Sequence, residues 1–231
     1  MRPILVVDCY VRREKDWMDN YRRYLAPGVE VVRADEGGTP LDSKPFSAVV
    51  VTGSAASVGT PERWQAAVED LIRDAAERDV PVLGICFGHQ LIARALFGAE
   101  AVFTRPVPEF GYLEVEVSGG DPLFSGFPAR FHPFVSHLDQ VRAVPGLQVL
   151  ARSAACPVHG LHVEGRRIWG VQFHVEMTPE EEWEVVSYRA TAHPDLGIDP
   201  EATFRGRTDS EPFALRLFGN FRRLVDRADE L

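Results

Sequence analysis

The sequence predicts an α/β protein with a central mixed, mostly parallel β-sheet. Three apolar runs, at residues 4–7, 48–51 and 82–85, have the length and composition of strands that are buried on both faces. Segments with helical spacing separate these runs, and such alternation is typical of parallel strands joined by right-handed crossovers. In the second half of the chain, short strands and turns follow one another, which predicts antiparallel strands as well.

Length and charge limit the class of protein. A chain of 231 residues with 45% hydrophobic content can bury the core of one domain, and we expect residues 1–231 to form it. The formal net charge of −9 argues against nucleic acid and anionic membranes as partners. No apolar run approaches the length of a membrane span, and residues 1–3 lead into a strand without a signal-peptide pattern. These features favour a cytoplasmic protein.

The cysteines are consistent with a reducing compartment. The chain has 3 cysteines without C-x-x-C spacing, which argues against a disulfide framework and against a structural zinc site. Neither a metal nor a cofactor is expected. Cys9 directly follows the first strand and is interpreted as a core residue, whereas Cys156 precedes Pro157 in an expected loop and is interpreted as incidental.

The first half of the chain alternates between strands and helices. Residues 16–25 are expected to form a helix and residues 29–32 a second strand. Small residues at 52–57 follow the next strand, where backbone amides can approach a ligand closely, although an ordinary loop fits equally well. Thr60 and Pro61 then suit the start of another helix. The apolar positions of that helix are Trp64, Ala67, Val68, Leu71, Ile72 and Ala75.

The second half is expected to be rich in strands. Apolar and polar residues alternate from 112 to 117, as in a half-exposed antiparallel strand. Further strands are expected at residues 130–135, 148–151, 160–163 and 168–173, with a hairpin turn at 164–166.

A C-terminal extension follows from residue 186 to residue 231. Its first part, residues 193–210, is rich in Asp, Gly and Pro and is expected to be irregular. Residues 211–228 have an apolar stripe at helical spacing. That stripe is expected to dock on the sheet, and the alternative is a seat for a partner subunit.

Cys86 occupies the most informative position in the sequence. It follows the strand at 82–85 and precedes a segment with helical composition, with Gly84 and Gly88 on either side. Such a sharp turn requires residues without Cβ atoms, and it is the pattern of a nucleophile elbow. The start of a helix favours a thiolate and offers amides to an oxyanion. The alternative is a buried cysteine that acts as a small hydrophobe.

A second candidate group lies at His174 and Glu176. Residues two apart on an extended chain point to the same side, so the carboxylate can reach an imidazole nitrogen. A base oriented by an acid, next to an activated cysteine, is the arrangement for thiol-dependent acyl transfer. A purely structural histidine is the alternative. The other histidines without a paired motif are expected to have surface or packing roles, and they are His89, His132, His159, His162 and His193.

Three motifs together resemble those of the class I glutamine amidotransferases. Residues 84–90 are similar to G-x-C-x-G-x-Q, and residues 173–176 resemble F-H-P-E. Residues 136–139 resemble the S-H-x-D segment of the branch that includes the glutaminase domain of GMP synthetase. The resemblance extends from about residue 4 to residue 185. It implies a flavodoxin-like three-layer sandwich with a seven-stranded mixed sheet, and hydrolysis of a γ-glutamyl amide through a thioester without a metal.

The resemblance also implies catalytic roles for individual residues. Cys86 matches the nucleophile, His174 the general acid and base, and Glu176 the residue that orients it. The backbone amide of Phe87 matches one oxyanion donor. The amide of Ser54 is expected to supply the other, because residues 53–55 stand where the family has Gly-Gly-Pro.

Substrate contacts are implied for four positions. Gln90 matches a side chain that contacts the amino acid head of the substrate, and Gly53 belongs to the oxyanion loop. Ser136 and His137 match the segment that closes over the substrate. Val175 replaces the family's proline, and valine also favours the extended backbone that His174 and its neighbours need.

Two enzymatic functions and one non-catalytic function fit these motifs. The first is a free-standing glutaminase or γ-glutamyl hydrolase whose substrate is glutamine or another small γ-glutamyl compound. The second is a glutaminase subunit that passes ammonia to a separate synthetase. The third is a regulatory module that keeps the fold without the chemistry. The sequence contains no ATP-binding glycine loop and no second core, which slightly favours simple hydrolysis.

Overall fold

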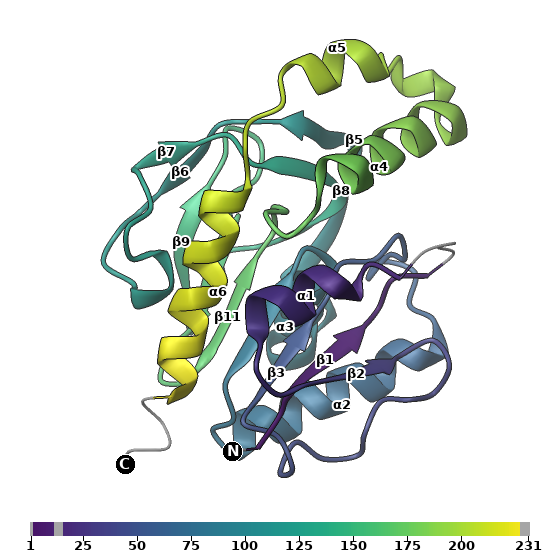
Figure 1. Ribbon diagram of the computed structural model, residues 1–231. Helices are drawn as coiled ribbons and strands as arrows, with labels where there is room; N and C mark the ends of the chain where they lie inside the picture. Colours follow the sequence, from purple (N-terminus) through teal and green to yellow (C-terminus); the bar gives the residue numbers. More distant parts are fainter. Residues whose placement is uncertain (1, 12–15, 227–231) are drawn as a thin grey trace.

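A computed structural model describes residues 2–11 and 16–226 of the chain. In this part, a 9-stranded sheet has the order β2-β1-β3-β4-β11-β10-β9-β6-β7, and β5 and β8 form a separate 2-stranded ribbon (Figure 1). The strands are β1 (Ile4–Asp8), β2 (Val29–Arg33), β3 (Ala48–Val51), β4 (Val82–Ile85), β5 (Val102–Tyr112), β6 (Val115–Val117), β7 (Arg130–Phe131), β8 (Phe134–Val141), β9 (Leu147–Arg152), β10 (Gly160–Val163) and β11 (Ile168–Val171). The helices are α1 (Met18–Leu25), α2 (Arg63–Glu77), α3 (Phe87–Phe97), α4 (Pro179–Ala192), α5 (Pro200–Arg205) and α6 (Glu211–Asp226). Short 3-10 helices are η1 (Ala99–Ala101), η2 (Pro122–Phe124) and η3 (Pro194–Leu196).

The sheet is mixed, as predicted. Strands β2, β1, β3, β4 and β11 pair in parallel, whereas β10, β9, β6 and β7 continue the sheet in antiparallel pairs. Every residue of β1, β3 and β4 is buried, which explains their continuous apolar sequences. The described sheet has 9 strands, more than the seven that the family resemblance implies, because the short strands β6 and β7 extend it beyond β9.

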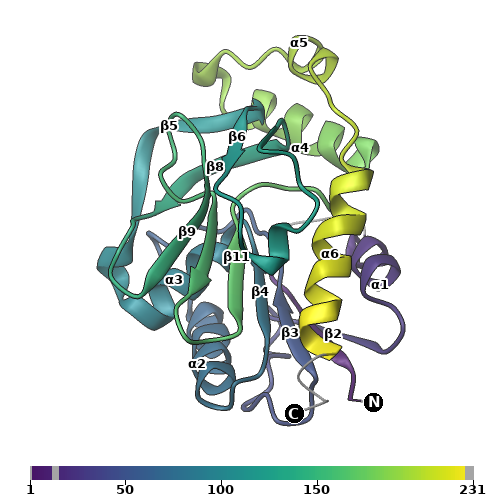
Figure 2. The same ribbon diagram turned by 90° about the vertical axis from the view of Figure 1, so that its left-hand side faces the viewer.

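Helices cover both faces of the parallel strands and create three layers (Figure 2). Side chains of β1 alternate between two cores: Val6 packs on the side of α1 and α6, and Leu5 and Val7 pack on the side of α2 and α3. This arrangement confirms the predicted α/β architecture. It also places the carboxyl ends of the parallel strands at one edge, where ligands bind in open α/β sheets.

The β5–β8 ribbon is the main element that the sequence did not reveal. Most of β5 was not predicted, because Pro106 and Pro108 interrupt its pattern and its register with β8 shifts between Thr104 and Glu109. The predicted strand at 130–135 is divided into β7 and the start of β8. The ribbon lies across the end of the sheet and contributes side chains to the cleft described below.

The C-terminal part, described to residue 226, contains three α-helices and the 3-10 helix η3. Helix α4 was not predicted from the sequence, although Thr178 and Glu181 form a capping box at its start and Pro179 occupies its first turn. The segment expected to be irregular contains the short helix α5. Helix α6 packs on the sheet beside α1, where the rings of Tyr24 and Phe218 stack with centroids 5.3 Å apart. No helix within residues 2–11 and 16–226 is long and apolar enough to cross a membrane.

Candidate active site

Cys86 lies in the sharp turn between β4 and α3. Its φ of 50° and ψ of −100° place a non-glycine residue in a conformation that L-residues rarely adopt. A Cβ on Gly84 would lie 2.5 Å from the backbone of Gly88, and a Cβ on Gly88 would lie 2.2 Å from the carbonyl oxygen of Val51. Both glycines are therefore required by close packing, as the elbow pattern predicts.

Backbone hydrogen bonds at the elbow use the amides of Cys86 and Gly88. The amide of Cys86 donates to Val171 O at 2.7 Å, and that of Gly88 donates to Thr52 O at 3.1 Å. Phe87 is the first residue of α3, so its N–H has no acceptor within the helix. Ser54 lines the same cleft from the loop after β3. The use of these two amides for an oxyanion stays a prediction.

His174 and Glu176 form a buried pair after β11. Nδ1 of His174 lies 2.7 Å from Oε1 of Glu176, and the peptide N–H of His174 donates to Phe134 O at 2.8 Å. Burial opposes a charged imidazole, but Glu176 and the nearby Cys86 raise the pKa of His174 well above its usual value. Burial also opposes the charge on Glu176, but His174 lowers the pKa of that carboxyl. The pair is thus held as imidazolium and carboxylate.

Gln172 is a site residue that was not predicted from the sequence. Its side-chain amide donates to Sγ of Cys86 at 3.5 Å, and its carbonyl accepts from Nε2 of Gln90 at 3.1 Å. The same Gln90 nitrogen donates to Asp139 O at 2.8 Å. The predicted strand at 168–173 ends at Val171, and the chain bends on either side of His174. The two-residue spacing that indicated His174 and Glu176 could also have indicated Gln172.

A small cleft opens beside Cys86 at the carboxyl end of the parallel strands. Five residues predicted for the site line it, namely Ser54, Cys86, Gln90, Ser136 and His137. The other lining residues are Ala55, Ala56, Ser57, Thr104, Leu138, Asp139 and Arg189. Gly53 lies behind the cleft instead, where an added Cβ would be 3.0 Å from Cε1 of His174 and 3.2 Å from the Tyr10 hydroxyl. Gly53 therefore allows the loop to approach His174.

Asp139 connects the walls of the cleft. One carboxylate oxygen accepts from the Ser57 hydroxyl at 2.6 Å and from the Val58 amide at 3.0 Å, and the other accepts from Thr104 on β5. This carboxylate joins the loop after β3 to the β5–β8 ribbon. The aspartate of the S-H-x-D motif thus has a structural role in holding the cleft together.

Arg189 is a basic residue at the cleft that was not predicted, because α4 itself was not predicted. It is half-buried on α4 and lines the opening. It forms no ion pair with the carboxylates of the described residues. A guanidinium in this setting is suited to a carboxylate of a bound molecule.

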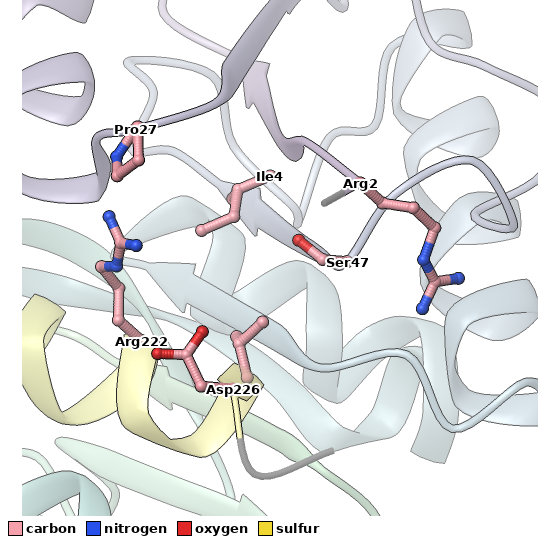
Figure 3. Close-up of a pocket in the computed structure, with 7 residues that line it drawn as sticks. Arg2, Ile4, Pro27, Ser47, Arg222 and Asp226 are labelled. Carbon is pink, nitrogen blue, oxygen red and sulfur yellow. The ribbon is translucent and has the colours of Figure 1, made fainter. Parts of the chain in front are cut away.

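A second hollow lies at the amino end of β1, away from Cys86 (Figure 3). Arg222 and Asp226 of α6 face Pro27 and Ile4 there, and Arg2 and Ser47 lie on the other side. Arg222 donates to the carbonyl oxygen of Leu25 at 2.9 Å. The hollow contains no nucleophile paired with a base, so the cleft at Cys86 is the candidate active site.

A thiol at a nucleophile elbow, beside an imidazole oriented by a carboxylate, defines the class of sites built for thiol-dependent acyl transfer. Within that class, the chain belongs to the class-I glutamine amidotransferase family, because residues 5–189 match the family profile described as "Glutamine amidotransferase class-I". The resemblance of the three motifs is thereby confirmed.

Relatives with similar sequences are named as glutamine-hydrolysing subunits of GMP synthase. The relative of that description from Pyrococcus furiosus is 35% identical over 160 residues, which cover 69% of this chain and 81% of that protein. The protein of the same name from Pyrococcus abyssi is 39% identical over 117 residues, which cover 50% of this chain and only 61% of the relative.

Solved structures have the same fold. A protein from Thermoplasma acidophilum, described as a "putative gmp synthase" subunit, has a TM-score of 0.72 at 25% identity, covering 100% of this chain and 96% of that one. A glutamine amidotransferase from Thermotoga maritima has a TM-score of 0.78 and covers 100% of both chains. The second likeness, at 22% identity, concerns the fold alone.

Proposed function

We propose that this protein hydrolyses the γ-glutamyl amide of glutamine, or of another γ-glutamyl compound, through a thioester on Cys86. The observation that carries the proposal is that Gln172 and the His174–Glu176 pair both lie beside the Cys86 thiol, which lines the cleft. Cys86 lies at the elbow, Gln172 donates to its sulfur, and the His174–Glu176 pair lies beside it. Membership of the glutamine amidotransferase family supports the same chemistry.

The first half of the reaction forms the thioester. The Cys86 thiolate attacks the γ-carbonyl carbon, and the C=O electron pair moves onto oxygen. The amides of Phe87 and Ser54 are proposed to stabilise this oxyanion. When the oxyanion collapses, the C–N bond breaks and His174 donates a proton to the leaving nitrogen, which departs as ammonia or as an amine.

The second half of the reaction releases glutamate. A water molecule takes the place of the departed amine, and the now neutral His174 accepts its proton as the oxygen attacks the thioester carbon. The C–S bond breaks and the thiolate is restored beside the imidazolium. Glu176 keeps the imidazole in one orientation during both halves, because its Oε1 accepts from Nδ1 and leaves Nε2 for the reacting groups.

Arg189 is proposed to bind the α-carboxylate of the γ-glutamyl group. A γ-glutamyl substrate carries this carboxylate on the side of the molecule away from the scissile amide. A half-buried guanidinium at the mouth of the cleft provides the complementary charge. Arg189→Ala should therefore raise KM for a γ-glutamyl amide about tenfold or more with little change in kcat, and Arg189→Lys should recover part of the loss. An unchanged KM in Arg189→Ala would remove this residue from the substrate site.

A second function is favoured by the names of the relatives. Several are named as one subunit of a glutamine-hydrolysing GMP synthase. By analogy, this chain would hydrolyse glutamine and pass ammonia to a separate synthetase. Both functions share the thioester chemistry and differ in the fate of the amine.

One set of assays separates these functions. The purified chain is incubated with glutamine and with several γ-glutamyl amines and peptides, and kcat/KM is compared with and without an added synthetase. High activity of the chain alone on a γ-glutamyl conjugate supports the hydrolase. Low activity that rises when the synthetase is added supports the ammonia-producing subunit. Cys86→Ala should abolish both activities, and a protein that binds a partner but forms no acyl-enzyme would be the regulatory module instead.

A further inference from the structure

A buried cluster of four metal-ligating side chains lies next to the cleft, and of these four only His137 also lines it. Glu109 is on β5, His137 is opposite it on β8, and Cys156 and His159 are in the segment between β9 and β10. All four are buried, and their nearest ligand atoms all lie within 4.8 Å of one another. The arrangement brings a carboxylate, a thiol and two imidazoles to one point.

The spacing of these atoms suits a tetrahedral metal ion. Oε2 of Glu109 lies 3.3 Å from Nε2 of His137 and 3.2 Å from Nε2 of His159. Zinc bonds to nitrogen and oxygen are about 2.0 Å long, and tetrahedral angles then separate two such ligand atoms by about 3.3 Å. The two distances from Oε2 of Glu109 to the histidine nitrogens therefore already match the separation of ligand atoms around a bound zinc ion.

The hydrogen bonds of His137 leave one of its ring nitrogens without a partner in the cluster. Its Nδ1 lies 3.1 Å from the carbonyl oxygen of Asp139, which can only accept, so Nδ1 carries the proton. In the neutral ring, Nε2 then presents a lone pair to the carboxylate of Glu109. Although the two atoms are 3.3 Å apart, Nε2 has no hydrogen-bond partner of acceptable geometry among the described residues. A metal ion would give this lone pair a partner, and it would replace the contacts that Oε2 of Glu109 makes with Nε2 of His159 at 3.2 Å and Nε2 of Gln140 at 3.5 Å.

The surroundings provide an outer layer of contacts and a path to solvent. The bond from His137 Nδ1 to a carbonyl oxygen is the contact that ligating histidines usually make with their second nitrogen. The Ser153 hydroxyl donates to Oε1 of Glu109, which directs Oε2 toward the cluster. Ala155 and Pro157, on either side of Cys156, are exposed, so an ion can enter beside the thiol.

We propose that Glu109, His137, Cys156 and His159 form a structural zinc site. One carboxylate and one thiolate balance the charge of Zn²⁺, and this mixed N, S and O set is of the kind that zinc accepts. The proposal departs from the expectation that the chain binds no metal. That expectation considered only C-x-x-C spacing, whereas these ligands come from three separate segments and include a C-x-x-H pair.

The site would fasten the β5–β8 ribbon to the main sheet. Two ligands belong to the ribbon, and the other two directly precede β10. His137 belongs to the segment that lines the cleft. The ring of His159 stacks on Phe173, the residue before His174, with ring centroids 6.4 Å apart. The metal would thus hold one wall of the cleft in place without touching the substrate.

Metal content and cobalt absorption test the proposal. The measurements are made in a Cys86→Ala background, because the active-site thiol and His174 could also bind a metal. After zinc-supplemented expression and dialysis, elemental analysis should give about one zinc per chain. Replacement by Co²⁺ should produce the intense d–d bands of a tetrahedral site and a thiolate-to-cobalt charge-transfer band. The metal-depleted protein should regain a higher Tm when zinc is added back.

Single substitutions then identify the ligands. Cys156→Ser should abolish the charge-transfer band, and His159→Gln should weaken zinc binding at least about tenfold. Cys9→Ser, which removes a buried thiol outside the cluster, should leave the charge-transfer band and the affinity for zinc unchanged. Failure of the metal-depleted protein to bind Co²⁺ or to gain stability with zinc would overturn the proposal. A charge-transfer band that survives in Cys156→Ser would overturn it as well. If Cys156→Ser does not fold, Co²⁺ absorption and the gain in Tm with zinc are measured on the metal-depleted protein and on His159→Gln instead. Absence of both effects in the metal-depleted protein, or effects in His159→Gln equal to those of the unchanged site, would overturn the proposal.

Discussion

Tyr10 donates its phenolic hydrogen to Oε1 of Glu176 over 3.1 Å, although 166 positions separate them in the sequence. Tyr21 donates to the same oxygen at 3.4 Å, and Oε2 accepts from the amide of Val175 at 3.0 Å. Burial raises the pKa of both tyrosines well above the usual value, so both remain donors. The carboxylate that orients His174 is thus itself held by two distant side chains.

The Tyr10 contact can be tested directly. Tyr10→Phe should lower kcat about tenfold with little change in KM, because loss of one hydrogen bond to a buried charge costs about 1.5–3 kcal/mol, part of which is expressed in the transition state. Steady-state kinetics on glutamine or a γ-glutamyl amide measures the effect. Tyr24→Phe is the matched control, since the Tyr24 ring stacks on Phe218 and its hydroxyl is not among the donors to Glu176 in the described residues. Equal effects of the two substitutions would contradict a positioning role for Tyr10.

Glu176→Gln should keep the fold and lower kcat by about two to four orders of magnitude, since an amide cannot support the imidazolium. It should also change the pH profile. The charge of Glu176 helps to raise the pKa of His174 against the effect of burial, so its removal lowers that pKa. The imidazolium then loses its proton at lower pH, so the alkaline limb of the kcat/KM profile should shift to lower pH. An alkaline limb that stays in place would mean that His174 does not determine it.

In the metal-depleted protein, the three thiols should react at different rates with iodoacetamide at pH 6.5. Burial, with Asp8 nearby, raises the pKa of Cys9 well above the usual value, and burial raises the pKa of Cys156 to about 12. Cys86, in contrast, lines the cleft at the start of α3. Peptide mass mapping should find Cys86 labelled first, and Cys86→Ser should lose the fast phase. Equal labelling of all three would show that the elbow does not activate its thiol.

Gly88→Ala should destabilise the protein by at least about 3 kcal/mol, because its Cβ would lie 2.2 Å from the carbonyl oxygen of Val51 and neither backbone can move freely. Urea unfolding measures the difference. Gly206→Ala is the control, with φ of −79° and a nearest neighbour 3.4 Å from the new Cβ. It should change stability by less than about 1 kcal/mol. Similar losses in both variants would contradict the close packing of the elbow.

Local patterns predicted a large part of the fold. The buried strands β1, β3 and β4 are continuous apolar runs because both of their faces are covered, and the helices between them have apolar stripes. Strand β5 was missed because its prolines suppress the strand pattern, and pairing with β8 forms it nevertheless. Helix α4 could have been predicted from its capping box, so in that case the signal was present and not used.

The sequence by itself determined the chemistry near each motif. Gly84, Cys86 and Gly88 specify the elbow, and the two-residue spacing of His174 and Glu176 brings their side chains together. Both relations involve only a few neighbouring dihedral angles. Only the tertiary structure decided which distant residues lie together. Tyr10, Arg189 and the buried cluster around Glu109 come from separate elements, and their contacts depend on sheet order and ribbon register. Such contacts leave no periodic signal in one sequence, since packing across the fold, and not local conformation, brings the groups together.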